Sequence, residues 1–165
     1  MDDQKDMARA EIVRHVDAPV GDVFDAMTDQ DRFGQWWGPH GFDASAVLDP
    51  RPGGRIELVM RAPDGSAAPV EGSYGEISRP SLIEMNLTAH GADGGGPMIA
   101  GEISIDLTED GNGTKIRVDA TGRALRPEGR PGVAGMREGW TESLERLQQL
   151  LEDGRGSTLK ARHET

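Results

Sequence analysis

The segment AGMREGWTESLERLQQLLED, residues 134–153, has the strongest helical pattern of this chain. Wound as a helix at about 100° per residue, it places its apolar side chains on one face. These are Met136, Trp140, Leu144, Leu147, Leu150 and Leu151. The opposite face carries Glu138, Glu142, Glu145 and Gln149. We therefore predict a long amphipathic helix from about Val133 to Glu152, packed on a sheet and ended by Gly154.

Two small residues, Gly139 and Ser143, sit beside Leu147 on the inward side of this helix. Glycine inside a helix costs about 1 kcal/mol relative to alanine, so its presence needs a reason. It can let the helix approach the sheet closely, or it can leave a void between helix and sheet that serves as a pocket. The helix alone leaves both readings open.

The chain before this helix alternates between apolar and polar residues with the period of a β-strand. The segments with this pattern are Ala8–Val16, Phe42–Leu48, Arg55–Arg61, Val70–Ile77, Leu82–Ala89, Met98–Leu107 and Lys115–Ala120. Asp110-Gly111-Asn112-Gly113 is a strong hairpin turn signal between the last two. One apolar face per strand predicts an antiparallel sheet that is wetted on one side.

Two short helices are expected between the first strand and the rest of the sheet. Pro19 suits the first turn of a helix, and Val23, Phe24 and Met27 follow it at helical spacing. The segment 28–31, Thr-Asp-Gln-Asp, resembles a capping box and should start a second helix. We expect that helix to reach about Trp36 and to stop at Gly38-Pro39.

The window FGQWWGPHGF, residues 33–42, contains two of the three Trp and two of the three Phe residues of the chain. Trp36 and Trp37 are neighbours at a helix end and point about 100° apart, so they cannot enter one pocket in the same way. Both can be core plugs that pack against Trp140. Alternatively, one packs in the core and the other lines the mouth of a cavity.

Composition and charge exclude several classes of function. The formal net charge is −11 over 165 residues, which disfavours a nucleic-acid partner and an anionic membrane surface. There is no cysteine, so disulfides and thiolate chemistry are absent. No apolar run is long enough to span a membrane, and the N-terminus lacks a signal segment. We therefore expect a cytoplasmic protein.

Four motifs are collinear with one known family. They are AP-x-x-x-V-F at 18–24, WWGPHGF at 36–42, GSYGEI at 72–77 and GMREGWTESLERL at 135–147. Over about residues 8–152 the chain resembles the homologues of the activator of heat-shock protein 90 ATPase, in the START-like superfamily (also called SRPBCC or Bet v 1-like).

The resemblance implies an α+β helix-grip fold, a curved antiparallel sheet of about seven strands wrapped around the long C-terminal helix. It implies one domain over 8–153, with disordered ends at 1–7 and 154–165, and an elongated internal cavity. Superfamily relatives bind lipids, steroids and polyketides, and some cyclise or dehydrate polyketide chains.

The residues that we expect to line such a cavity share an aromatic, polarisable or titratable side chain near the helix–sheet junction. They are Trp36, Trp37, His40, Phe42, Tyr74, Met136 and Trp140. Tyr74 is in phase with Val70 and Gly72 and should point inward, where its hydroxyl needs a partner from the protein or from a ligand. His40 is either an exposed loop residue or a polar group at the cavity mouth.

No catalytic residue, metal site or cofactor is predicted. His15, His40, His90 and His163 lack metal-ligand spacing. The segment from Arg123 to Gly132 carries three arginines and is either a mobile, solvated loop or a rim with affinity for an anionic ligand group.

The sequence favours a monomer or homodimer that binds a small hydrophobic or aromatic molecule. One alternative is a cyclase or dehydratase in which His40 or Tyr74 is the general acid or base. Another is a co-chaperone type of interaction module with a chaperone partner and a filled interior.

Overall fold

The computed structural model describes residues 6–38, 41–91 and 96–164, with side chains up to residue 152. It contains one antiparallel sheet of seven strands in the order β1-β7-β6-β5-β4-β3-β2. The strands are β1 (Met7–Val16), β2 (Asp43–Leu48), β3 (Arg55–Arg61), β4 (Ala67–Ser78), β5 (Leu82–His90), β6 (Pro97–Asp110) and β7 (Gly113–Ala124). The helices are α2 (Val20–Thr28), α3 (Gln30–Trp36), the 3-10 turn η1 (Pro127–Gly129), α4 (Arg130–Ala134) and α5 (Met136–Glu164).

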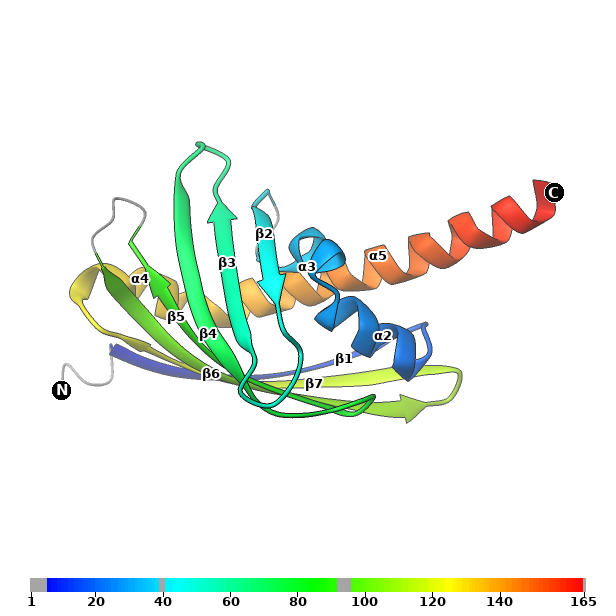
Figure 1. Cartoon of the computed structure of the whole chain (residues 1–165), viewed down its shortest axis with the longest axis horizontal. Helices are drawn as coiled ribbons and strands as arrows, with labels where there is room; N and C mark the ends of the chain where they lie inside the picture. Colours follow the sequence, from blue (N-terminus) through cyan, green and yellow to red (C-terminus); the bar gives the residue numbers. More distant parts are fainter. Residues whose placement is uncertain (1–5, 39–40, 92–95, 165) are drawn as a thin grey trace.

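The sheet curves around α5, and α2 and α3 lie together at one end (Figure 1). The inner face buries the alternating apolar residues of the strands, among them Ile56, Leu58, Ile83, Ile105 and Ile116. Against them lie Leu144, Leu147 and Leu151 from the apolar stripe of α5. This is the α+β helix-grip fold that the sequence predicts.

The size of the inward side chains varies along the sheet, and the site lies where they are small. Ile105 and Ile116, in the half near α2, are fully buried. Toward α4 the inward positions of neighbouring strands are small, with Ala89, Gly101 and Gly122 in place of branched side chains. Small residues cannot fill the space beneath a helix, so the core is less completely packed at this end.

Helices cover both edges of the sheet. At β2, the Leu48 N–H donates to Gln30 Oε1 of α3 at 3.2 Å. At β1, Arg137 of α5 donates to the Glu11 carbonyl at 3.2 Å. Covered edges protect the sheet from pairing with a second chain.

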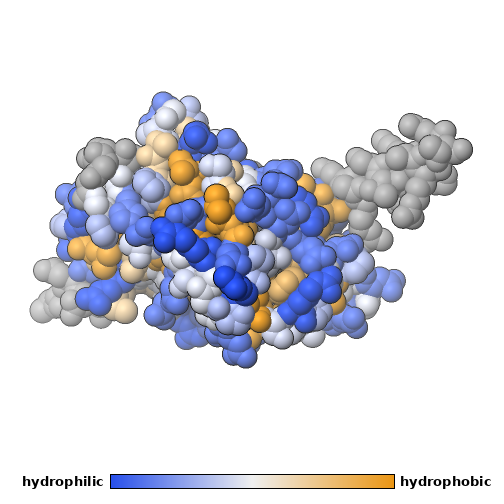
Figure 2. Space-filling view, in the orientation of Figure 1, coloured by the Kyte–Doolittle hydropathy of each residue, from blue (hydrophilic) through white to orange (hydrophobic). Residues whose placement is uncertain are grey.

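The outer face is largely hydrophilic. Figure 2 shows a short apolar band over β2 and β3 among hydrophilic residues. Val47 of β2, with 59% of its surface exposed, contributes to the apolar surface of the molecule.

Several boundaries differ from the sequence prediction. The cap of α3 is Asp29 rather than Thr28: the Asp29 side chain accepts from Asp31 N–H at 2.9 Å. The Thr28 hydroxyl instead donates to the Phe24 carbonyl of α2 at 2.9 Å. The predicted hairpin turn is present between Asp110 and Gly113, and Gly111 there has a positive φ of 62°.

The predicted C-terminal helix is divided. Gly135 separates α4 from α5, and α4 begins at Arg130, inside the predicted loop. The backbone of α5 continues to Glu164, beyond the predicted end at Gly154. A single glycine lowers helix stability by only about 1 kcal/mol and need not terminate a helix.

The N-terminal boundary also shifts. β1 begins at Met7, and Arg130 donates to the Asp6 carboxylate at 2.6 Å, so residues 6 and 7 belong to the domain. Residues 1–5 lie outside the described residues. Within the described part of the chain, no helix combines the length and the apolar character needed to cross a bilayer.

Candidate functional site

The two adjacent tryptophans have different environments. Trp36 is fully buried, and its Nε1 donates to the Ala26 carbonyl of α2 at 3.2 Å. Trp37 is half-buried and follows the last helical residue of α3. The change of direction at the helix end therefore makes Trp36 a core residue and leaves Trp37 at the boundary of the core.

All three tryptophans belong to one aromatic cluster. Trp37 stacks on Phe33 with ring centroids 5.1 Å apart and meets Trp140 of α5 edge-to-face at 5.0 Å. Trp36 packs edge-on against Phe33 at 4.9 Å and lies 6.4 Å from Trp140. Such pairs add about 0.5–1.5 kcal/mol each beyond area burial, so the cluster holds Trp37 in a defined orientation.

A cavity of about 410 Å³ lies beside this cluster, between the helices and the sheet. Its described lining is mostly aromatic, thioether and glycine: Trp37, Gly38, Phe42, Met60, Ile99, Gly132, Gly135, Met136, Gly139, Trp140 and Ser143. A deeper space of about 140 Å³ shares six of these residues and reaches the small inward positions of the sheet, including Gly101 and Gly122. Cavities of a few hundred Å³ are typical of small-molecule sites.

Glycines on both layers create the space. A β-carbon built at Gly139 would meet no atom within 4 Å, so the helix is not pressed against the sheet there. At Gly101 a β-carbon would meet only ordinary contacts, of which the nearest, Thr121 O, is at 3.4 Å. The void is therefore the correct reading of the inward glycine of α5. Gly122 is different, because a β-carbon built there would lie only 3.0 Å from the Met136 sulfur, which fills the space next to the glycine.

Two side chains of α5 hold the Trp37–Gly38 segment that forms one wall. The Gly38 N–H donates to Ser143 Oγ at 2.8 Å. Arg146 Nη1 donates to the carbonyls of Trp37 at 3.1 Å and Gly38 at 3.0 Å. Partial burial lowers the pKa of the Arg146 guanidinium, which Asp43 partly offsets. The segment that leaves α3 is thus fixed to α5 through the Gly38 N–H and through the carbonyl oxygens of Trp37 and Gly38.

Four of the seven residues predicted to line the cavity do so: Trp37, Phe42, Met136 and Trp140. Trp36 does not, because it is enclosed by the core. Tyr74 is 2% exposed and points inward as predicted, but it is not among the residues that line this cavity. His40 lies outside the described residues.

The Tyr74 hydroxyl has no hydrogen-bond partner among the described residues. Burial raises the pKa of Tyr74, and the negative charge of Asp49 raises it further. The phenol is therefore neutral at physiological pH and is a poor general base.

The arginine-rich segment 123–132 is ordered by its own contacts. Arg130 binds Asp6, and Arg126 donates to the Gly96 carbonyl at 3.3 Å. Neither residue lines the cavity. The expectation of a loop is wrong for this segment, because η1 and α4 occupy most of it.

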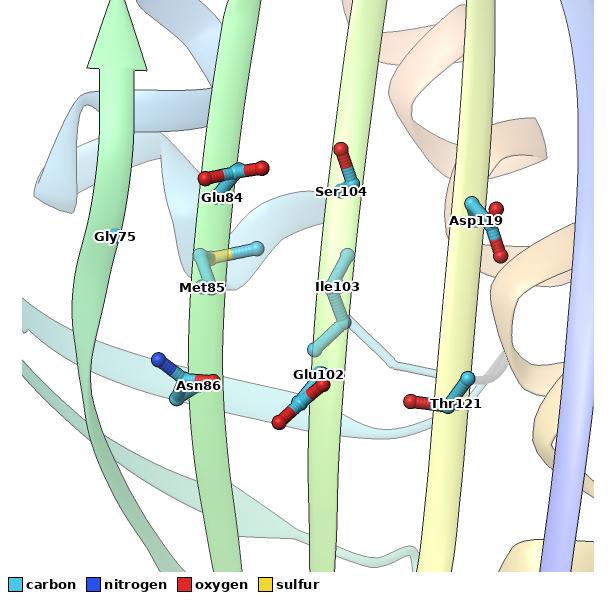
Figure 3. Close-up of a pocket in the computed structure, with 9 residues that line it drawn as sticks. All are labelled: Gly75, Glu84, Met85, Asn86, Glu102, Ile103, Ser104, Asp119 and Thr121. Carbon is cyan, nitrogen blue, oxygen red and sulfur yellow. The ribbon is translucent and has the colours of Figure 1, made fainter.

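A second depression, of about 310 Å³, lies on the outer face of the sheet. Polar side chains of three adjacent strands reach it, with Glu84, Ser104 and Asp119 in one row of Figure 3. Both carboxylates have partners: Asp119 accepts from Arg9 at 2.7 Å, and Glu84 accepts from the Glu76 N–H at 3.1 Å. Among the described residues no group of three or more potential ligands could hold a metal ion.

Sequence reasoning did not select Met60, Ile99, Gly132 or Ser143 for the site. Met60 and Ile99 were visible only as inward residues of separate strands, and their meeting depends on the strand order. Ser143 and Gly139 carried a detectable signal, because small residues interrupt the apolar stripe of a helix.

Comparisons with known proteins agree with this architecture. A structure from Rhizobium leguminosarum aligns with a TM-score of 0.76 at 24% identity, covering 89% of this chain and 95% of that one. One from Arthrobacter aurescens aligns with a TM-score of 0.75 at 23% identity, covering 88% and 86%. One from Mycobacterium smegmatis aligns with a TM-score of 0.70 at 23% identity, covering 87% and 90%. The comparison with curated proteins gave no match.

At these identities the structural similarities establish the fold alone. The family assignment rests on the sequence, since the model described as "Activator of Hsp90 ATPase homolog 1-like protein" matches residues 17–152. That range includes both short helices, the sheet from β2 to β7 and the part of α5 that lines the cavity. The chain therefore belongs to the family of activator of Hsp90 ATPase homolog 1-like proteins.

Proposed function

We propose that this protein binds an apolar or aromatic small molecule in the cavity between α5 and the sheet. The observation that carries the proposal is the unfilled space of about 410 Å³ bounded by Trp37, Phe42, Met136 and Trp140. Burial of apolar ligand surface would supply the affinity, at about 25 cal/mol per Å² before the cost of association is subtracted. Indole and thioether walls suit a flat ring system.

Two features of the cavity favour binding over the alternatives. A cyclase or dehydratase needs an acid or base at the ligand, and the described lining residues include none that titrates. A purely protein-interacting module needs no internal space, whereas the glycines of α5 and β6 leave one at a cost in packing.

Native mass spectrometry of the protein purified from its own host tests the proposal. We expect a bound molecule of defined mass that is released on denaturation. In Gly139→Leu the new side chain projects into open space at the cavity and should abolish this adduct. Gly139→Ala, which adds a single methyl group at the same position, is the matched control and should retain most of the adduct.

An adduct of equal abundance in the wild type and in Gly139→Leu would place the bound molecule elsewhere. Wild-type protein that carries no ligand and shows no tryptophan fluorescence change with neutral polycyclic compounds would contradict the proposal. All three tryptophans lie in the cluster beside the cavity, so their emission is a local reporter.

A further inference from the structure

We propose that the ligand is a neutral rather than anionic molecule with a hydrogen-bond acceptor, and that the hydroxyl of Ser143 donates to this acceptor. The inference rests on the proposed function and makes the class of ligand more specific. It assigns to Ser143 a direct contact with the ligand, in addition to its contact with Gly38.

Ser143 is a buried polar residue on the cavity wall. It is 3% exposed and, like its partner Gly38, lines the space beside Trp37 and Trp140. A serine hydroxyl has one hydrogen to donate and two lone pairs that accept. The Gly38 N–H occupies one lone pair at 2.8 Å, and the hydroxyl hydrogen meets no acceptor among the described residues.

Threonine hydroxyls on α5 and in the core donate to a backbone carbonyl, whereas the buried Tyr74 hydroxyl, away from this cavity, has no partner among the described residues. Thr141, two residues before Ser143 on α5, donates to the Arg137 carbonyl at 2.8 Å. Thr114, which is fully buried, donates to the Ala18 carbonyl at 2.7 Å. Ser143 departs from this pattern at the position where the cavity begins. A buried donor without an acceptor is unfavourable, and a ligand acceptor would satisfy it.

No described lining residue carries a positive charge that could pair with an anionic ligand group. None of these residues is ionisable. The guanidinium beside the wall, that of Arg146, directs Nη1 to the Trp37 and Gly38 carbonyls. The protein as a whole carries a net charge of −11. Transfer of an anion from water into this space would therefore be costly, whereas a neutral carbonyl oxygen needs only one donor.

Ser143 is also the one described lining residue whose side-chain hydroxyl can face the cavity. Thr121 borders the deeper space, but its side chain belongs to the outer face of the sheet, where Figure 3 shows it beside Glu102. The indole Nε1 of Trp37 is a second donor on this wall, buried and without a partner among the described residues. The Ser143 hydroxyl would therefore orient a ligand without binding it tightly by itself, and Ser143→Ala separates its contribution from that of Trp37.

The test uses three tricyclic compounds of similar shape: fluorene, 9-fluorenone and 9-oxofluorene-2-carboxylate. Their dissociation constants are measured by calorimetry or tryptophan fluorescence for the wild type, Ser143→Ala, Ser143→Thr and Thr141→Ala. Ser143→Thr retains the hydroxyl, and Thr141→Ala removes a hydroxyl of the same helix that does not line the cavity. Thermal unfolding of each variant is recorded in parallel.

We expect the wild type to bind 9-fluorenone about threefold to tenfold more tightly than fluorene, since one neutral hydrogen bond separates them. Ser143→Ala should lose this preference and still bind fluorene, while Ser143→Thr and Thr141→Ala should keep it. The carboxylate should bind at least about tenfold more weakly than 9-fluorenone.

Equal binding of fluorene and 9-fluorenone by the wild type, or a preference that survives in Ser143→Ala, would overturn the role of Ser143 and leave the proposed function intact. Tighter binding of the carboxylate would overturn the selection for neutral ligands. Binding of none of the three compounds would count against the proposed function itself. If Ser143→Ala does not fold, a loss of preference in Ser143→Thr overturns the role of Ser143.

Discussion

Gly139 illustrates how one residue changes a packed helix into the wall of a cavity. It occupies an inward position of α5, one turn before Ser143 and beside Trp140, where an apolar side chain would otherwise fill the space. Its cost in helix stability is about 1 kcal/mol relative to alanine. Since a β-carbon there would meet nothing within 4 Å, packing does not require the glycine.

Gly139→Ala should therefore stabilise the protein by about 0.5–1 kcal/mol, raising the midpoint of thermal unfolding by about 1–4 °C. Calorimetry or circular dichroism measures the shift. Gly34→Ala is the contrasting variant, because its β-carbon would overlap the Ala44 carbonyl oxygen, and it should destabilise strongly. A fall in the midpoint for Gly139→Ala would show that the helix needs the glycine for close packing.

His15 makes a pH-dependent contribution to the free energy of unfolding. Its Nε2 lies 3.1 Å from Asp17 and its Nδ1 lies 3.1 Å from Asp110. These hydrogen bonds, that to Asp17 first, raise the pKa of His15 above 6.5. A raised pKa in the folded state stabilises the protein below the unfolded value of about 6.5, and this stabilisation disappears as pH rises through the folded pKa.

We therefore expect the stability difference between the wild type and His15→Gln to be largest at low pH and to shrink as pH rises above about 6.5. Urea unfolding at several pH values gives the difference, and NMR titration of the ring gives the pKa directly. A titration midpoint below 6.5 would show that the two carboxylates do not bind the protonated ring.

At the scale of elements, α5 organises the site by holding the segment that leaves α3. Ser143 and Arg146 stand three residues apart on the helix and bind consecutive backbone groups of Trp37 and Gly38. The same helix supplies Met136, Gly139 and Trp140 to the lining. The helix α5 therefore both anchors the Trp37–Gly38 wall and supplies other residues of the lining, and a shift of α5 would move both.

Arg146→Met retains much of the side-chain stem and removes the hydrogen bonds to the Trp37 and Gly38 carbonyls. Because the donor is charged and partly buried, we expect a loss of about 1–2 kcal/mol in the free energy of unfolding, measured with urea. Arg51→Met removes an exposed ion pair with Asp49 and should cost less than about 0.5 kcal/mol. Equal losses in the two variants would mean that Arg146 does not secure the wall.

At the scale of the whole molecule, net charge affects the stability of the fold, and the helices along the sheet edges affect its tendency to associate. The net charge is −11, and the ion pairs Arg9–Asp119 and Arg117–Glu11 lie at the surface. Exposed pairs contribute little, so repulsion among the excess carboxylates is the larger electrostatic effect. Helices along β1 and β2 oppose association through the sheet edges.

Addition of 0.2 M sodium chloride to a low-salt buffer near neutral pH should therefore raise the unfolding midpoint, because salt shortens the range of the repulsion to less than about 8 Å. Thermal unfolding at several salt concentrations measures the effect. A midpoint that falls with salt would mean that the surface ion pairs outweigh the repulsion.

The sequence predicted the seven strands, the two short helices and the long C-terminal helix in their order along the chain, but not η1 and α4. The period of two places every strand, and the stripe from Met136 to Leu151 identifies the helix that the sheet grips. These signals are local, since each depends on side chains close together along the chain. The inward orientation of Tyr74 followed from the phase of its strand, and Phe42, Met136 and Trp140 were expected at the cavity from the family resemblance.

Three features of the site required the three-dimensional structure: which tryptophan faces the cavity, whether Gly139 leaves a void, and which backbone group Ser143 binds. Trp36 and Trp37 are the same residue type at adjacent positions, so the sequence does not distinguish them. The direction of the chain at the end of α3 buries Trp36 in the core and places Trp37 at the cavity. The void depends on Gly101 and Gly139, which lie on different layers and meet only after the sheet curves around α5. Contacts between residues that are far apart in the sequence leave no periodic pattern in it. The shape and polarity of the cavity are therefore set only when the helix and the sheet pack together.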